Sequence, residues 1–318
     1  MLKIRPFVKG QDEETYVKIF NAAFAKEYED VRAITLEEMS KFEKSPSYSQ
    51  EGLLMAEIDG EPAGMVDAFI DKFREEKKGF IQMLAVLPKF RHKGVARKLF
   101  EEALKSLRQR EMTVAEAWTR SDKQACIHIY ESFGFKPVRI ISMMRRTLEN
   151  LPGNIGENTE ASIKEVALNN EENLKLLNKL DNETFKEHFN FRPRTIEETK
   201  YALLENPWFS KQEWFIAFLD EQPAGFVGAV IDEELNKEKK LRWGWIYDVG
   251  VLKSYRRKGI GARLMLHAMQ RLKLYGMADI VLYVDEMNPT KAIKLYEKLG
   301  FKTLYKGITY QRTLNSGR

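Results

Sequence analysis

Short runs of alternating apolar and polar residues are separated along the chain by longer stretches of helical spacing, and the same series of patterns occurs twice. Alternation predicts strands, and helical spacing predicts helices. The first series predicts strands at 2–7, 52–58, 63–70, 79–86 and 114–118, helices at 13–28 and 35–44, a long helix from Gly94, a helix ending at Gly134 and a last strand. The second predicts strands at 162–167, 214–219, 224–231, 241–251 and 280–284, helices at 171–189 and 195–205, a long helix from Gly259, a helix ending at Gly300 and a last strand. This order predicts an α/β (α+β) fold in each half, with a mixed, mostly antiparallel sheet flanked by helices.

Three blocks of matching sequence show that the two series are copies of one module. The matched pairs are 59–64 with 220–225, 82–97 with 247–262, and 129–136 with 295–302. Because the blocks recur in the same order, duplication explains them better than coincidence. The length of 318 residues also suits two domains of about 150 residues each. We therefore predict domains at 1–150 and 161–318, joined by a linker at 151–160 that is rich in Gly, Pro and Asn.

Composition narrows the class of protein. The net charge of +5 fits a polyanionic small ligand and is too small for a dedicated DNA-binding face. The single cysteine, Cys126, excludes an intrachain disulfide, and the four histidines lack the spacing of a helical metal site, so no metal is predicted. No apolar run approaches the roughly 18 residues that span a bilayer, and the first residues do not resemble a signal peptide. We predict a cytoplasmic protein that contacts neither membrane nor nucleic acid and is a monomer or homodimer.

A basic, glycine-containing turn in the second half is the main candidate for an anion site. The sequence Arg-Arg-Lys-Gly-Ile-Gly at 256–261 lies between a strand ending at Val251 and a helix beginning near Gly259. A helix N-terminus offers unpaired N–H groups and a positive dipole end, which suit a diphosphate. The Walker pattern is absent. The dinucleotide fingerprint does not fit either, since Leu264 stands where its third glycine is needed. A solvated basic turn is the alternative, but the recurrence of this context in both halves favours a phosphate site.

The motifs resemble those of a known superfamily. Arg-x-x-Gly-x-Gly/Ala follows a strand in both halves, as Arg91, Gly94 and Ala96 and as Arg256, Gly259 and Gly261. This pattern is similar to the acetyl-CoA signature of the GNAT superfamily of N-acetyltransferases, and the later Tyr-Glu-x-x-Gly-Phe segments resemble that family's closing motif. The tandem arrangement resembles mycothiol synthase-type double-GNAT enzymes.

The resemblance implies acetyl-CoA as co-substrate and a set of residues that would bind it. Amides at 92–97 and 257–262 would hold the diphosphate, and strand backbone at 84–86 and 249–251 would pair with the pantetheine arm. The implied binding residues are Leu84, Ala85, Val86, Arg91, His92, Lys93, Gly94, Val95, Ala96 and Arg97, and in the second half Val249, Gly250, Val251, Arg256, Arg257, Lys258, Gly259, Ile260, Gly261, Ala262 and Asn288.

Acetyl transfer to an amine also needs a group that protonates the departing sulfur. Tyr130 and Tyr296 occupy matching positions, and the resemblance implies that Tyr296 protonates the thiolate. A tyrosine with a pKa of about 10 stays protonated at neutral pH and can donate to a thiolate whose parent pKa is about 8.5. The alternative is a core tyrosine, because Ala292, Tyr296 and Leu299 form one helical stripe.

The general base is less closely defined by the sequence. Asp248 is the best-placed carboxylate on the coenzyme strand, and its alternative is a solvated strand-end residue. Many relatives hold a glutamate three residues earlier, where Trp245 stands here, so a base acting through water or a backbone carbonyl stays open.

The two halves differ at key positions. The first half has Ala96 for Gly261, Asp122 for Asn288 and Met83 for Asp248, so catalysis is expected in the second half. The alternatives for the first half are coenzyme binding without turnover and a weaker or different activity. We predict an N-acetyltransferase that moves acetyl from acetyl-CoA to a primary amine of a small molecule or peptide by direct attack on the thioester. The alternative is a non-catalytic acyl-CoA sensor or scaffold. Aromatic residues at 208, 209 and 214 and the segment 187–191 could line an acceptor pocket, although core packing explains them more simply.

Overall fold

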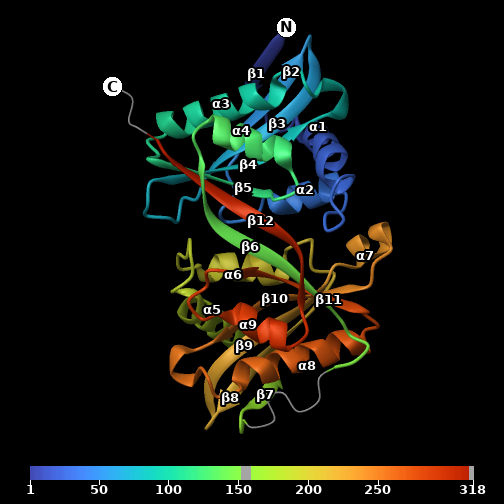
Figure 1. Ribbon diagram of the computed structural model, residues 1–318, viewed down its shortest axis with the longest axis vertical. Coiled ribbons are helices and arrows are strands. Elements are labelled where there is room, and N and C mark those ends of the chain that lie inside the picture. The colour runs from blue at the N-terminus through green and yellow to red at the C-terminus, as the bar shows by residue number, and fades with distance from the viewer. Residues whose placement is uncertain (152–158, 315–318) are drawn as a thin grey trace. The chain divides into compact units, whose positions relative to one another are not determined.

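The computed structural model describes residues 1–151 and 159–314 (Figure 1). The chain forms two compact units. Unit 1 consists of Met1–Arg139 and the C-terminal segment from Gly307, and unit 2 consists of Ile140–Lys306. Most of the predicted linker, 152–158, lies outside the described residues.

Unit 1 contains the predicted series of elements. Its sheet has the order β1-β2-β3-β4-β5-β12, in which β4 and β5 are parallel and the other pairs are antiparallel. The elements are β1 (Leu2–Pro6), α1 (Glu13–Phe20), α2 (Leu36–Phe42), β2 (Leu53–Ile58), β3 (Glu61–Ile70), β4 (Lys78–Val86), α3 (Val95–Gln109), β5 (Val114–Arg120) and α4 (Gln124–Ser132). A π-helical turn at Asn21–Ala25 extends α1.

Unit 2 repeats this architecture. Its sheet has the order β7-β8-β9-β10-β11-β6, with β10 and β11 parallel. The elements are β7 (Ser162–Glu165), α5 (Glu171–Phe185), α6 (Ile196–Leu204), β8 (Lys211–Leu219), β9 (Gln222–Ile231), α7 (Glu233–Lys239), β10 (Trp243–Val251), α8 (Ile260–Leu274), β11 (Asp279–Asp285) and α9 (Ala292–Lys298). The α/β class and the mixed, mostly antiparallel sheets are as predicted. Helix α7, which Asp232 caps through its bond to the amide of Leu235, was not predicted.

The last strand of each half pairs in the other unit. Strand β6 (Lys136–Thr147) follows α4 but pairs with β11, from Ile141↔Asp285 to Thr147↔Asp279. Strand β12 (Lys302–Thr313) follows α9 but pairs with β5, from Gly307↔Arg120 to Thr313↔Val114. The compact units therefore depart from the predicted division into 1–150 and 161–318. Alternation along a strand specifies which face is buried and leaves the partner strand unspecified.

Helices pack on both faces of the unit 2 sheet. Helix α8 buries one side, with Leu264, Met265, Ala268, Met269 and Leu272 almost fully enclosed. Helix α5 covers the opposite face, where Leu174, Leu177 and Leu180 pack near Trp214 and Phe226. Asn170 caps α5, and a capping box between Thr195 and Glu198 begins α6. Packing of α8 on one face and α5 on the other therefore fixes the position of β10 within the protein.

Candidate active site

The parallel strands β10 and β11 separate part-way along their length. They pair only from Trp243↔Asp279 to Trp245↔Val281, although β10 continues to Val251 and β11 to Asp285. Backbone groups at 246–251 therefore face an opening where a further strand-like ligand could bind. Unit 1 shows the same separation, because β4 and β5 pair only over Lys78–Ile81 and Val114–Ala117.

A bulge in β10 sets which side chains face this opening. The register with β9 shifts between Ile246 and Val249, so Tyr247 and Asp248 lie in the bulge. The ring of Tyr247 contacts that of Phe209, with centroids 4.6 Å apart, on the side covered by α5 and α6. Asp248 shares that side, since it interacts electrostatically with residues of α5 and of the loop before α6.

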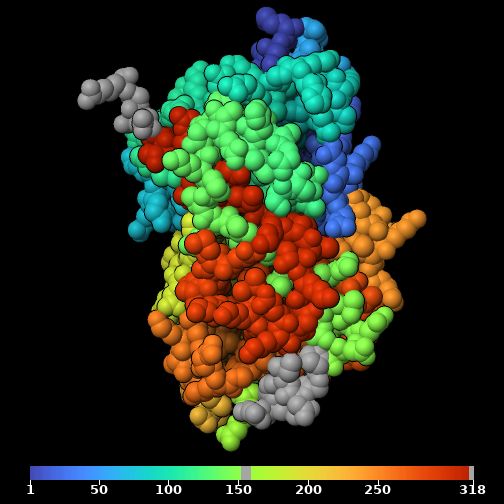
Figure 2. All heavy atoms as spheres, in the orientation of Figure 1, coloured from blue at the N-terminus to red at the C-terminus, as the bar shows by residue number. Residues whose placement is uncertain are grey.

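A cavity of about 770 Å³ occupies the opening and extends to the N-terminus of α8. Its walls are the separated ends of β10 and β11, the C-terminal turn of α5, the start of α8, and α9. In Figure 2, the C-terminal part of unit 2 that includes α9 lies at the molecular surface, coloured red. The predicted site residues that line the cavity are Asp248, Val249, Gly250, Val251, Arg256, Arg257, Gly259, Ile260, Gly261, Ala262, Asn288 and Tyr296. Lys258, also predicted, is exposed beside them.

The loop before α8 has a backbone shape that suits an anion. Arg257 and Gly259 both have left-handed φ values, 68° and 80°, and His92 and Gly94 repeat them in unit 1 at 60° and 77°. Such alternation turns successive N–H groups toward one point, next to the unpaired amides of the helix start. A Cβ added to Gly261 would meet nothing closer than 3.5 Å, so the alanine of unit 1 is compatible with the same loop.

The first arginine of each motif is bonded within the protein. Arg256 donates from Nε to the carbonyl of Val251 at 3.1 Å and from Nη1 to Glu187 at 2.7 Å. Arg91 likewise donates to the carbonyl of Val86 and pairs with Glu27. Bonds from Lys253 and Arg256 lower the pKa of Glu187 to about 2. This arginine therefore holds the strand end to the preceding helix, and the exposed Arg257 and Lys258 are the cations directed outward.

Tyr296 and Asp248 lie close enough to influence each other. Burial raises the pKa of Tyr296, and the charge of Asp248 raises it further, so Tyr296 stays protonated. Burial and the nearby Asp181 raise the pKa of Asp248, while Arg194 opposes them. A protonated tyrosine and a carboxyl group with a raised pKa thus line one cavity.

Tyr130 is held differently from Tyr296. It is buried, and its hydroxyl donates to the carbonyl of Trp118 at 3.2 Å. Its ring stacks on Phe100, with centroids 5.3 Å apart. The geometry of Tyr130 is that of a core residue.

Asn288 shapes the turn before α9. Its Oδ1 accepts from the amide and hydroxyl of Thr290, and its Nδ2 lies 3.2 Å from Nε2 of His188. Its counterpart in unit 1, Asp122, belongs to an ionic group instead. There Arg120 pairs with Asp122 at 3.1 Å and with Asp30 at 3.5 Å.

Two residues that the sequence analysis did not select complete the polar surroundings of Asp248. Asp181 of α5 and Arg194 ahead of α6 form an ion pair at 3.5 Å. Each lies inside an ordinary charged segment, so periodicity alone does not mark it. The signal available was the replacement of both by apolar residues in the first half, Phe20 and Ile34.

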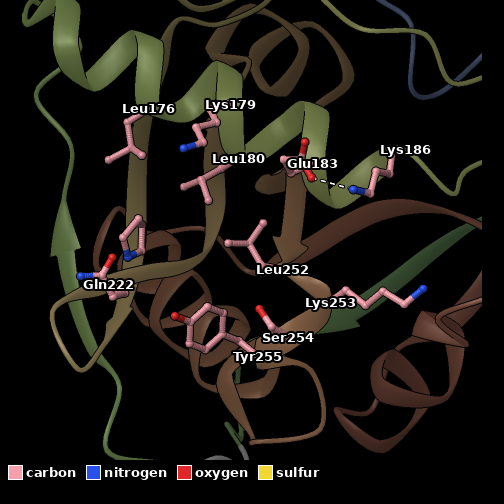
Figure 3. A pocket seen from close by; sticks show the side chains of 11 residues that line it. Leu176, Lys179, Leu180, Glu183, Lys186, Gln222, Leu252, Lys253, Ser254 and Tyr255 are labelled. Carbon is pink, nitrogen blue, oxygen red and sulfur yellow. Dashed lines mark hydrogen bonds and ion pairs between the residues drawn. The ribbon is translucent and has the colours of Figure 1, made fainter.

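A second cavity, of about 690 Å³, lies between α5 and the segment that leads into the α8 loop (Figure 3). Leu180 and Leu252 point toward each other in it, while Glu183 and Lys186 bond along the helix and Lys253 points away. Of the described residues that line it, none was predicted as a site residue. This cavity borders the segment that leads into the loop before α8, and neither Asp248 nor Tyr296 lines it.

Comparison with known proteins identifies the family. The model of the acetyltransferase (GNAT) family matches residues 14–135 and 176–301. Similar proteins include the mycothiol acetyltransferase of Thermomonospora curvata, 28% identical with 72% of both chains covered. That of Thermobispora bispora is 29% identical, with 72% of this chain and 75% of the relative covered.

Solved structures show the same tandem fold. A tandem GNAT protein from the clavulanic acid biosynthesis pathway superposes with a TM-score of 0.75 at 14% identity, covering 100% of this chain and 99% of that one. A GNAT-family N-acetyltransferase from Sphaerobacter thermophilus gives a TM-score of 0.69 at 19% identity, covering 98% and 95%.

The chain belongs to the GNAT acetyltransferase family, in its tandem form. It is an acetyltransferase that moves an acetyl group from acetyl-CoA to an amine, as predicted. Among the described residues, no group of three or more His, Cys, Asp or Glu side chains is arranged to hold a metal. None of the helices in the described ranges is long and apolar enough to cross a membrane.

Proposed function

We propose that unit 2 performs the acetyl transfer, with Asp248 as general base, Tyr296 as general acid and a small-molecule primary amine as acceptor. The observation that carries the proposal is the presence of both ionisable groups on one cavity between separated strands. Unit 1 has the same separation but holds Met83 and an internally bonded tyrosine in the matching places.

The coenzyme would lie along the open edge of β10. Its diphosphate would meet the amides at 257–262 and the positive end of α8, and its pantetheine arm would pair with the backbone at Val249 and Val251. This arrangement brings the thioester to the bulge, next to Asp248. Arg257 and Lys258 would add attraction for the phosphates from the exposed side of the loop.

The chemical step follows from the two side chains. The amine nitrogen attacks the thioester carbonyl carbon, the carbon–nitrogen bond forms, and the carbon–sulfur bond breaks. Asp248 accepts the proton that the nitrogen loses, and Tyr296 donates its proton to the departing sulfur. Bulk solvent restores both groups. The raised pKa of Asp248 brings its proton affinity closer to that of the amine, which favours general-base catalysis.

The acceptor class rests on the relatives. The similar proteins are named mycothiol acetyltransferases, after a small molecule, and this supports a small primary amine over a protein acceptor.

The test compares the same substitution at matching positions. Coenzyme release from acetyl-CoA with a panel of primary amines is measured for wild type, Tyr296→Phe and Tyr130→Phe. We expect Tyr296→Phe to lower kcat by roughly 10²- to 10⁴-fold, because the leaving sulfur loses its proton donor. Tyr130→Phe should stay within about threefold of wild type, since its hydroxyl only bonds a carbonyl in unit 1. Loss of turnover with Tyr130→Phe alone would overturn the assignment to unit 2.

A further inference from the structure

Two arginines at matching positions lie at the C-terminal ends of the helices that carry Tyr130 and Tyr296. Arg146 lies on β6, beside β11, and Arg312 lies on β12, beside β5. The same number of positions separates the two arginines as separates the two tyrosines. Because β6 and β12 are exchanged, Arg146 comes from the first half of the sequence but belongs to unit 2, whereas Arg312 belongs to unit 1.

The guanidinium group of Arg146 bonds three carbonyl groups. It donates from Nη1 to the carbonyl of Leu299, the C-cap residue of α9, from Nη2 to that of Asn150, and from Nε to that of Thr147 at 3.2 Å. The last carbonyl groups of a helix have no intrahelical partner, and a cation there also meets the negative end of the helix dipole. Arg146 therefore joins the end of α9 to the end of β6.

Arg312 makes the matching bond in unit 1, but the tyrosines differ in what holds them. Nη1 of Arg312 donates to the carbonyl of Phe133, the C-cap residue of α4, at 2.5 Å. The hydroxyl of Tyr130 is also held directly, by its bond to the carbonyl of Trp118. Among the described residues, no partner holds the hydroxyl of Tyr296. The direction of the Tyr296 side chain therefore depends on the position of α9 and on the packing of its ring.

Helix α9 has little else to fix it along its axis. It has seven residues, and its N-cap residue, Lys291, makes no side-chain capping bond within the described part of the chain. Its inner face packs on the core of unit 2 through Tyr296 and Leu299. Apolar packing is not directional, so it holds the helix against the sheet but fixes its position along the sheet less firmly than hydrogen bonds do. The bond from Arg146 supplies such a fixed point.

We infer that Arg146 is a positioning residue for Tyr296, which it keeps directed into the cavity that also holds Asp248 by anchoring the end of α9. This role depends on the proposed function of unit 2. Tyr296 and Leu299 are about one turn apart, so a shift of the helix end would move the phenol relative to the thioester. A misplacement of about 1 Å can cost about 10²-fold in rate. Unit 2 would thus use a residue from the first half of the sequence, which gives the strand exchange a part in the reaction.

The matched arginines allow a controlled test on the full-length protein. For Arg146→Gln, Arg146→Lys and Arg312→Gln, kcat and KM for acetyl-CoA are measured with one primary amine, together with thermal unfolding. Arg146→Gln should lower kcat roughly 10- to 100-fold and leave KM for acetyl-CoA within about threefold, because the proton donor moves while the loop before α8 stays in place. Arg146→Lys should have a higher kcat than Arg146→Gln, because an ammonium group can still donate to the Leu299 carbonyl.

Arg312→Gln is the control for a merely structural effect. It removes the same kind of bond from a helix end, so its unfolding temperature should fall by a few degrees, as in Arg146→Gln. Its kcat should stay within about threefold of wild type, because Tyr130 keeps the bond of its own hydroxyl.

A double-mutant cycle shows whether Arg146 acts through Tyr296. In the Tyr296→Phe background, Arg146→Gln should lower kcat by no more than about twofold further, since the hydroxyl that it positions is already gone. The inference is overturned by losses that multiply, by an unchanged kcat in Arg146→Gln, or by an equal loss of kcat in Arg312→Gln. A wild-type kcat in Tyr296→Phe alone would instead refute the proposed acid, and the role of Arg146 with it.

Discussion

The two units share a fold, a motif and a separation of parallel strands, yet they differ in what surrounds that separation. In unit 2 the opening carries an aspartate, a tyrosine without a hydrogen bond to its hydroxyl among the described residues, and an asparagine turn. In unit 1 the corresponding tyrosine bonds a carbonyl, and Arg120 forms ion pairs with two aspartates near the end of β5. Both units thus keep the loop, whereas only unit 2 has these side chains around the opening, and the proposed function assigns the activity to them.

The largest effect is expected from separating the halves. Expressed alone, 1–150 would lack the β12 strand that pairs with β5, and 160–318 would lack the β6 strand that pairs with β11. Each fragment would expose a sheet edge and so associate or aggregate. We expect no activity from either fragment, measured with size-exclusion chromatography and the coenzyme-release assay. Co-expression of both should recover activity, and a fully active, monomeric 160–318 would contradict the strand exchange.

Removing the proposed base should have the next largest effect. Asp248→Asn should lower kcat/KM by roughly 10²-fold near neutral pH. In wild type, activity should fall as the pH drops through the raised pKa of Asp248, because the protonated carboxyl cannot accept a proton. The limb should therefore lie above the usual aspartate range of about 3.9. The control is Met83→Asn, the same replacement residue at the matching position of unit 1, which should keep the wild-type profile.

The smallest effect concerns two glycines of the coenzyme site. A Cβ at Gly250 would lie 2.3 Å from Oγ1 of the buried Thr184, whereas one at Gly261 would approach nothing closer than 3.5 Å. Gly250→Ala should destabilise the protein by about 1–3 kcal/mol through overpacking, measured by denaturant unfolding. Gly261→Ala should unfold like wild type. Equal stability of both variants would show that α5 does not press on β10 as described.

Much of this architecture could be predicted from the sequence, because the same series of patterns occurs in both halves and each half supports the prediction for the other. The strands, the two long helices that begin after Gly94 and Gly259, and the basic loops before those helices all follow from local pattern and turn chemistry. The resemblance to the family depended on the Arg-x-x-Gly-x-Gly/Ala motif of the same loop, and the family match confirms it. The residues predicted for the site in unit 2 line one cavity, except Lys258, because the elements that carry them follow the predicted order. Their roles stay a prediction.

What the sequence did not predict depends on long-range pairing. The exchange of β6 and β12 cannot be deduced from alternation, which is similar in both strands. Arg256 bonds Glu187, and Arg91 bonds Glu27, inside the protein. These bonds could not be predicted, because each glutamate is distant in the sequence from its arginine. The ion pair between Asp181 and Arg194 likewise joins α5 to the loop before α6, and the local sequence pattern does not indicate it. In each case the information lies in tertiary contacts.

The most direct test of the claim that unit 2 performs the transfer is a titration of the intact protein with acetyl-CoA by calorimetry, together with the coenzyme-release assay. Gly259 and Gly94 have nearly the same left-handed φ, so valine at either position imposes a similar strain on a helix start. We expect Gly259→Val to lose the coenzyme bound by unit 2 and, in the coenzyme-release assay, turnover with it, whereas Gly94→Val should keep turnover. Turnover that survives Gly259→Val and disappears with Gly94→Val would contradict the assignment of catalysis to unit 2.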